Sequence, residues 1–76
     1  MKVHLWDSNN DFMWGTLENN RFSVWNNNGL YLHGNLNGTN ISLWDNENHY
    51  YHGSLQGEKI SLWDHNNKYI WGNISK

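Results

Sequence analysis

Apolar and polar residues alternate along this chain in short runs that return at a constant interval. One run ends in tryptophan and a short polar residue, and it occurs four times, at Val3–Asp7, Phe22–Asn26, Ile41–Asp45 and Ile60–Asp64. A second run follows each of these with an aromatic, a glycine and an aliphatic residue at matching offsets. A fixed period of about 20 residues is typical of repeat proteins, in which each unit buries its apolar face against its neighbours. We therefore predict one domain, 1–76, made of the four repeats 3–21, 22–40, 41–59 and 60–76.

The alternation within each repeat has a period of two, and clusters of Asn and Gly separate the runs. This pattern predicts two short antiparallel strands in each repeat, and an all-β meander of eight strands for the whole chain. The three-residue connection inside each repeat ends in Asn or Gly, which tolerate the positive φ of a hairpin loop with a left-handed bulge. The polar residues before these loops are expected to accept hydrogen bonds from loop amides as Asx turns. They are Asp7, Asn26, Asp45 and Asp64.

A three-residue loop fixes which residues face each other across each hairpin. Tryptophan then lies opposite an aromatic residue, in the pairs Trp6–Phe12, Trp25–Tyr31, Trp44–Tyr50 and Trp63–Tyr69. Aromatic pairs of this kind stabilise a sheet by about 0.2–1 kcal/mol each. The opposite face is mainly aliphatic and is the predicted core: Val3, Leu5, Leu17, Phe22, Val24, Leu32, Leu36, Ile41, Leu43, Leu55, Ile60, Leu62, Ile70 and Ile74.

The connection between repeats decides whether the sheet closes. Asn37-Gly38, the strongest hairpin signal in the chain, and Gln56-Gly57 suggest a two-residue turn. Such turns would pair the repeats without any shift between them and leave an open sheet that needs a second copy in a sandwich dimer. A four-residue connection over 18–21, 37–40 and 56–59 would instead shift each repeat by two residues and give eight strands a shear of eight. Closure also removes exposed edges, which a chain without proline has few other means to protect. We therefore expect a closed or nearly closed barrel, with the open sheet as the alternative.

Composition and charge exclude several classes of protein. The chain has no cysteine, so a disulfide or thiolate zinc site is excluded. A net charge of −2 provides no basic surface for nucleic acid. No run approaches the ~20 apolar residues of a spanning helix, and the first residues lack the apolar stretch of a signal peptide, so we expect no membrane partner and a cytoplasmic location by default. At 76 residues, association into a homo-oligomer is also expected to help stability.

The residues that carry chemistry point away from catalysis. His33 and His52 occupy an offset where the other two repeats have Trp14 and Trp71, whereas a metal site needs several converging ligands. The seven acidic residues lie in or beside predicted turns, and no nucleophile, base and orienting group stand together. We predict no enzyme activity, no metal and no cofactor.

The strongest functional signal lies on the mixed face, where aromatic residues alternate with amide, hydroxyl and imidazole groups. A sugar stacks its apolar C–H face on indole or phenol rings, and its hydroxyls need donors and acceptors in fixed positions. We predict a lectin-like, carbohydrate-binding module with up to four equivalent weak sites, and repetition of a weak site gives avidity. The predicted ligand-binding residues are Trp6, Trp25, Trp44, Trp63, Tyr31, Tyr50, Tyr69, Trp14, His33, His52 and Trp71.

A segment of the third repeat carries a resemblance to known proteins. The run Trp44–Tyr51, with its Tyr-Tyr pair, and the later Gly57 resemble the aromatic hairpin repeats of bacterial cell-wall-binding modules and clostridial toxin receptor-binding regions. The resemblance extends weakly over all four repeats, and it implies a module that holds choline or glycans between aromatic rings. Cation–π contact with choline is a narrower form of the same expectation.

Two alternatives to glycan binding remain open at this point. The aromatic residues could pack as a second core or a subunit interface, which would make the protein an interaction or self-assembly module. The constant period without insertions also fits a designed or consensus-derived protein, although irregular residues such as His4 and Phe22 argue for natural drift.

Overall fold

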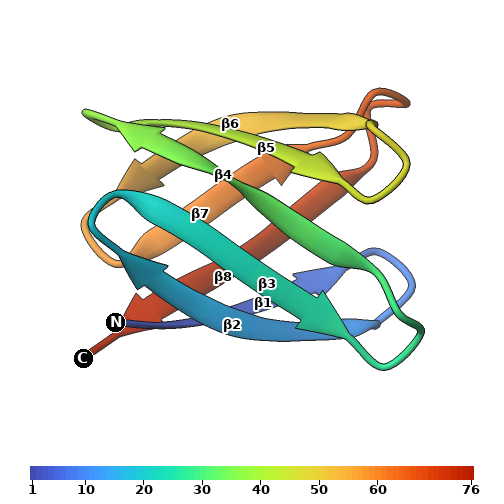
Figure 1. Ribbon diagram of the computed structural model, residues 1–76, viewed down its shortest axis with the longest axis horizontal. Coiled ribbons are helices and arrows are strands. Elements are labelled where there is room, and N and C mark those ends of the chain that lie inside the picture. Colours follow the sequence, from blue (N-terminus) through green and yellow to red (C-terminus); the bar gives the residue numbers. More distant parts are fainter.

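The alternating runs form eight antiparallel strands in a computed structural model that describes all residues, 1–76 (Figure 1). The strands are β1 (Lys2–Asp7), β2 (Phe12–Glu18), β3 (Arg21–Asn26), β4 (Tyr31–Asn37), β5 (Asn40–Asp45), β6 (Tyr50–Gln56), β7 (Lys59–Trp63) and β8 (Tyr69–Ser75). Each strand pairs with the next, and β8 pairs with β1. The predicted closed barrel is confirmed, and the alternative of an open sheet covered by a second copy is wrong.

The two ends of the barrel carry different connections. The longer loops, which join β1 to β2, β3 to β4, β5 to β6 and β7 to β8, lie at the right in Figure 1. The short turns and both chain termini lie at the left, where Lys2 pairs with Ser75. Closure thus depends on the two ends of the chain meeting, because β1 and β8 supply the last ladder of the barrel.

The register within each hairpin matches the sequence prediction. Tryptophan lies opposite the expected aromatic residue in all four hairpins, as in Trp44 and Tyr50. The loop residues at Asn10, Gly29, Asn48 and Asn67 have positive φ, between 63° and 84°. Each preceding Asp or Asn accepts two backbone N–H bonds through Oδ1, at 2.8 to 3.0 Å. The Asx turns are therefore confirmed.

The register between hairpins provides the stagger that closes the barrel. Val3 lies opposite Gly15 on β2, and Gly15 lies opposite Val24 on β3. The residue of the second repeat that corresponds to Val3 is Phe22, so the pairing has shifted by two residues from one repeat to the next. The same shift recurs at the later ladders, including the closing one between β8 and β1. Four shifts of two residues give eight strands a shear of eight, which suits a small barrel filled by its own side chains.

The turns between hairpins are tighter than the four-residue connection predicted for the barrel. Asn37 pairs with Asn40, which leaves only Gly38-Thr39 at the tip. The alternative turn centred on Asn37-Gly38 is wrong, because it would place Leu36 opposite Thr39. In the observed register Leu36 lies opposite Ile41, and both side chains turn toward the interior.

The aliphatic face fills the barrel. Fourteen hydrophobic side chains are buried, and Leu30, Leu36 and Leu55 pack against them half-buried. Twelve of the fourteen predicted core residues are buried; Leu36 and Leu55 are the two that stay partly exposed. Met13 and Tyr51, each paired across a hairpin with a predicted core leucine, complete the cluster. No buried side-chain nitrogen or oxygen lacks a hydrogen-bond partner.

The turn between β2 and β3 offers a test of local backbone strain. Asn19 and Asn20 both have positive φ, at 53° and 66°, as a type I′ turn requires. Alanine resists this conformation, so we expect Asn20→Ala to lose about 1 kcal/mol of unfolding free energy. Asn20→Gly is expected to stay within about 0.5 kcal/mol of the unmodified protein, because glycine adopts positive φ freely but loses more entropy on folding. Urea unfolding midpoints measure both, and equal losses in the two variants would contradict the explanation.

Candidate functional site

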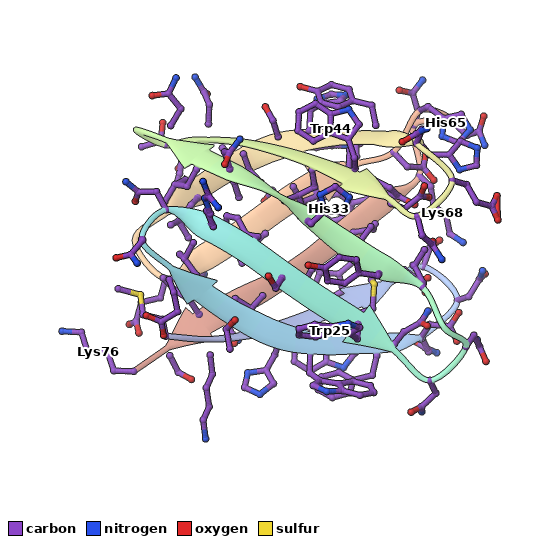
Figure 2. The ribbon with its side chains drawn as sticks, in the orientation of Figure 1. Trp25, His33, Trp44, His65, Lys68 and Lys76 are labelled. Atoms are coloured by element: carbon purple, nitrogen blue, oxygen red, sulfur yellow. The ribbon has the colours of Figure 1, made fainter.

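The eleven predicted ligand-binding residues all lie on the outer face of the barrel. Together with Phe12 they form a continuous aromatic belt, in which each ring neighbours the next either across a ladder or two residues along a strand. The belt runs in the order Trp6, Phe12, Trp14, Trp25, Tyr31, His33, Trp44, Tyr50, His52, Trp63, Tyr69 and Trp71, and Trp71 pairs with Trp6 to close it. Figure 2 shows Trp25, His33 and Trp44 in line across β3, β4 and β5.

Most neighbouring rings of the belt are in contact. In the second hairpin the centroid of Tyr31 lies 5.1 Å from Trp25 and 5.3 Å from His33, with interplanar angles of 28° and 24°. His52 stacks on Trp63 at 6.3 Å, which joins the third hairpin to the fourth. No ring stacking joins Trp14 to Trp25, His33 to Trp44, or Trp71 to Trp6. The belt is therefore a series of groups of stacked or tilted rings, separated by three breaks in ring contact.

The belt is open to solvent. Its tryptophans other than Trp6 are between 36% and 43% exposed, and Trp6 and Tyr31 are half-buried. Small soluble domains rarely expose so many large rings together, and an apolar surface of this kind generally marks a binding or interaction site. Within the single chain the aromatic residues therefore form no second core.

Three tyrosines of the belt are held in place by serine. The hydroxyl groups of Tyr50 and Tyr69 lie 3.2 and 3.3 Å from the Oγ atoms of Ser42 and Ser61. Tyr31 makes the same contact with Ser23 at 3.5 Å. In the first hairpin the equivalent residues are Phe12 and His4, whose rings stack at 5.8 Å. Each ring of this row is thus fixed from the strand beside it.

Two of the three breaks in the belt open into grooves on the outer surface. The β3–β5 groove encloses about 520 Å³ and is lined by Arg21, Phe22, Ser23, Tyr31, His33, Gly34, Asn35 and Trp44. The β7–β1 groove encloses about 720 Å³ and is lined by Lys59, Ile60, Ser61, Tyr69, Trp71, Gly72, Asn73 and Trp6. Each volume falls in the range of about 300–1,000 Å³ that small-molecule sites occupy.

The two grooves are built from equivalent positions. Each lining residue of one lies two repeats along the chain from its counterpart in the other, counting Trp6 as following Trp44 through the closing ladder. Their middle strands, β4 and β8, are four positions apart in either direction around the eight-stranded barrel, so the grooves face opposite sides of the molecule. The grooves differ mainly at two positions, where Arg21 replaces Lys59 and His33 replaces Trp71.

A glycine lies on the middle strand of each groove. Gly34 in β4 lets β5 approach so closely that an added Cβ would overlap the Ser42 carbonyl oxygen and lie 2.7 Å from Leu43 Cα. Gly72 has the same relation to β1, where the Cβ would meet the His4 carbonyl and Leu5. Gly15 and Gly53 make the same close approach in the other two hairpins, so these glycines allow neighbouring strands to pack closely all around the barrel and do not by themselves account for the grooves.

At the other two equivalent positions, rings stack on each other where the grooves have no such contact. In the first hairpin His4 lies against Phe12, and in the third His52 closes the step to Trp63. The sequence predicted up to four equivalent sites, and it treated the pairs of rings as alike. The structure distinguishes the four sites. His4 stacks on Phe12 in the first hairpin and His52 stacks on Trp63 in the third, whereas the second and fourth hairpins have no equivalent contacts.

Sequence reasoning missed a polar cluster at the loop end of the third hairpin. Asp45 is only 3% exposed, and its Oδ2 accepts a hydrogen bond from the Tyr51 hydroxyl at 2.9 Å and lies 3.1 Å from His49 Nδ1. The His49 ring in turn stacks on His65, with centroids 4.3 Å apart. Tyr51 was the available signal, because it stands where other hairpins place Met13, Leu32 or Ile70 in the core, and a buried phenol needs a partner.

The cluster shifts the acidity of both of its central groups. Burial by itself would raise the pKa of Asp45, but hydrogen bonds from the backbone N–H groups of His49 and Glu47 and from Tyr51, with the nearby imidazole, lower it below its ordinary value of 3.8. Burial, the bond to Asp45 and the surrounding carboxylates raise the pKa of Tyr51 well above its ordinary value of 10.0. The carboxylate is thus held in its charged form and the phenol in its neutral form.

No group of three or more His, Asp or Glu side chains is arranged to hold a metal ion. No helix of the chain is long and apolar enough to cross a membrane. No protein-family model, curated protein or solved structure matches the chain.

Proposed function

We propose that the protein is a non-enzymatic carbohydrate-binding module in which each of the two grooves holds a saccharide. The observation that carries the proposal is the pairing, in both grooves, of a serine-fixed tyrosine and a tryptophan with an asparagine and other polar groups. Aromatic rings offer stacking surface to the C–H face of a sugar, while amide and hydroxyl groups orient its hydroxyls. Choline-type ligands are a narrower case of the same proposal, held by cation–π contact.

The breaks in the belt give the sugar a place to stack. In the β3–β5 groove no stacking joins His33 to Trp44, although the two residues face each other across the ladder between β4 and β5. Trp71 and Trp6 have the same relation across the ladder between β8 and β1. A sugar ring in either groove would contact aromatic surface that is otherwise exposed to water, and removal of that surface from water favours binding.

Tryptophan substitutions test the proposal. We expect saccharide titration, followed by tryptophan fluorescence and by NMR, to show two sites in the unmodified protein. Trp44→Ala is expected to weaken the β3–β5 site at least about tenfold, or about 1.4 kcal/mol, and Trp6→Ala to do the same to the β7–β1 site. Trp14→Ala is the matched control, because Trp14 is an exposed belt residue that lines neither groove. A folded protein that binds no saccharide at millimolar concentration would rule the function out.

A second candidate function is a protein-interaction or self-assembly module. It is favoured by the belt outside the grooves, where Phe12, Trp14, Trp25, Tyr50 and Trp63 are exposed. Exposed aromatic residues are enriched at the energetic centres of protein interfaces. Sedimentation distinguishes the two functions: a stable oligomer with blue-shifted tryptophan emission that saccharides do not alter would favour the second.

A further inference from the structure

Each groove contains one cation and no carboxylate among its lining residues. Arg21 lines the β3–β5 groove and Lys59 lines the β7–β1 groove, at equivalent positions. Both residues are exposed, and each lies across its ladder from an asparagine, Asn35 or Asn73. This repetition is notable in a chain with only five lysine and arginine residues and a net charge of −2.

Neither of these cations is used in an ion pair. The three ion pairs of the chain join the amino terminus to Glu18, His49 to Asp45, and Lys68 to Asp7. Glu18 lies opposite Arg21 across the turn, but its Oε1 is 3.1 Å from the amino terminus. The residue opposite Lys59 is the uncharged Gln56. Arg21 and Lys59 are therefore available to a ligand.

The cation lies at the opposite end of each groove from the stacked tyrosine. Arg21 is opposite Asn35, and Tyr31 is four residues away along β4, which corresponds to roughly 13 Å of strand. Ser23 and His33, which face each other, lie between the two ends. The groove thus combines an aromatic end, a polar middle and a cationic end, and it is longer than a single sugar ring.

From this arrangement we infer that the grooves select acidic saccharides, with a sugar ring on the tyrosine end and a carboxylate or sulfate at Arg21 or Lys59. The inference rests on the proposed function, since it specifies the class of saccharide. The guanidinium of Arg21 offers a planar fork that matches a carboxylate, whereas the Lys59 ammonium acts as a point charge. Both prefer an anion to a neutral hydroxyl.

Matched saccharides test the selection by charge. We expect sialyllactose to bind at least tenfold more tightly than lactose, and trigalacturonate more tightly than its methyl ester, in which the same rings lack the charge. Lactose 3′-sulfate separates the two sources of charge. If it binds more tightly than lactose, the grooves select sulfate as well as carboxylate. If only the carboxylate-bearing saccharides bind more tightly than their uncharged partners, the selection is for carboxylate alone. Equal binding within all three pairs would overturn the inference.

Variants locate the selection in the grooves. The double variant Arg21→Gln/Lys59→Gln is expected to bind sialyllactose and lactose with nearly equal affinity. Lys68→Gln/Lys76→Gln is the matched control, because it changes the net charge by the same amount at residues that line neither groove, and its selectivity is expected to be retained. An acidic preference that survives in the groove variant would also overturn the inference.

The outcomes separate this inference from the proposed function. Binding of the charged and uncharged members of all three pairs with equal affinity would overturn the charge selection and leave carbohydrate binding in place. Absence of binding to every saccharide by the folded protein would overturn both. Adenosine monophosphate is an informative competitor, because its base stacks on aromatic rings and its phosphate is an anion; tighter binding of this nucleotide than of any saccharide would also overturn both.

Discussion

Replacing Gly34 with alanine is expected to cost at least about 3 kcal/mol of unfolding free energy, which is most of the stability of a domain this small. The added Cβ would overlap the Ser42 carbonyl oxygen and crowd Leu43 Cα, both of which are backbone atoms of β5. A flexible side chain could move away, but a backbone atom moves only if the ladder between β4 and β5 opens. Because each kcal/mol shifts the melting temperature of a domain of this size by about 4–8 °C, thermal unfolding followed by circular dichroism measures the loss readily.

Gly38 provides the matched control for this prediction. It has a φ of +65° and no atom within 4 Å of an added Cβ, so only backbone strain opposes a side chain there. Gly38→Ala is expected to lose about 1–2 kcal/mol, the usual cost of a left-handed conformation. If both alanine variants lost the same amount, close approach between strands would not be the reason for glycine in β4.

Most of the barrel could be predicted from the chain because two periods reinforce each other. The period of two assigns each residue to a face, and the constant spacing of the repeats produces the same hairpin four times. The connection between hairpins was harder to predict, since Asn37-Gly38 is a strong turn signal for the wrong register. Both registers keep Leu36 and Ile41 on the interior face, so the face assignment does not choose between them. The observed register supplies the two-residue shift at each repeat that closes the barrel, and closure depends on the whole sheet and not on one turn.

The candidate site could be predicted only as a set of residues. The aromatic belt follows from the face assignment, so every predicted binding residue lies on one surface. The grooves depend on small differences between hairpins: His52 stacks on Trp63, whereas the equivalent His33 does not stack on Trp44. Ring orientation of this kind is fixed by contacts between neighbouring strands, and residue spacing alone does not reveal it.

Loss of the Asp45 carboxylate is the second large effect that we expect. Asp45→Ala removes two hydrogen bonds to the loop and leaves the buried Tyr51 hydroxyl without its acceptor. Lost loop bonds cost about 1 kcal/mol, and an unsatisfied buried hydroxyl adds about 1–3 kcal/mol, so the expected loss is about 2–4 kcal/mol. Asp64→Ala is the matched control, because Asp64 accepts the same two loop bonds but has no tyrosine partner, and its loss is expected to be about 1 kcal/mol.

The pH dependence of the Asp45 effect has a definite sign. The pKa of Asp45 is lower in the folded protein than its ordinary value of 3.8, so the unfolded chain binds a proton first. Protonation therefore favours the unfolded state, and the stability that the charged carboxylate contributes is present above pH 3.8 and is lost as the pH falls through the folded pKa. The free energies of unfolding of the unmodified protein and of Asp45→Ala, measured with denaturant, should accordingly differ most near neutral pH and converge in strong acid. A difference that grew as the pH fell below 3.8 would show that Asp45 is not held in its charged form by the hydrogen bonds from Tyr51 and the loop.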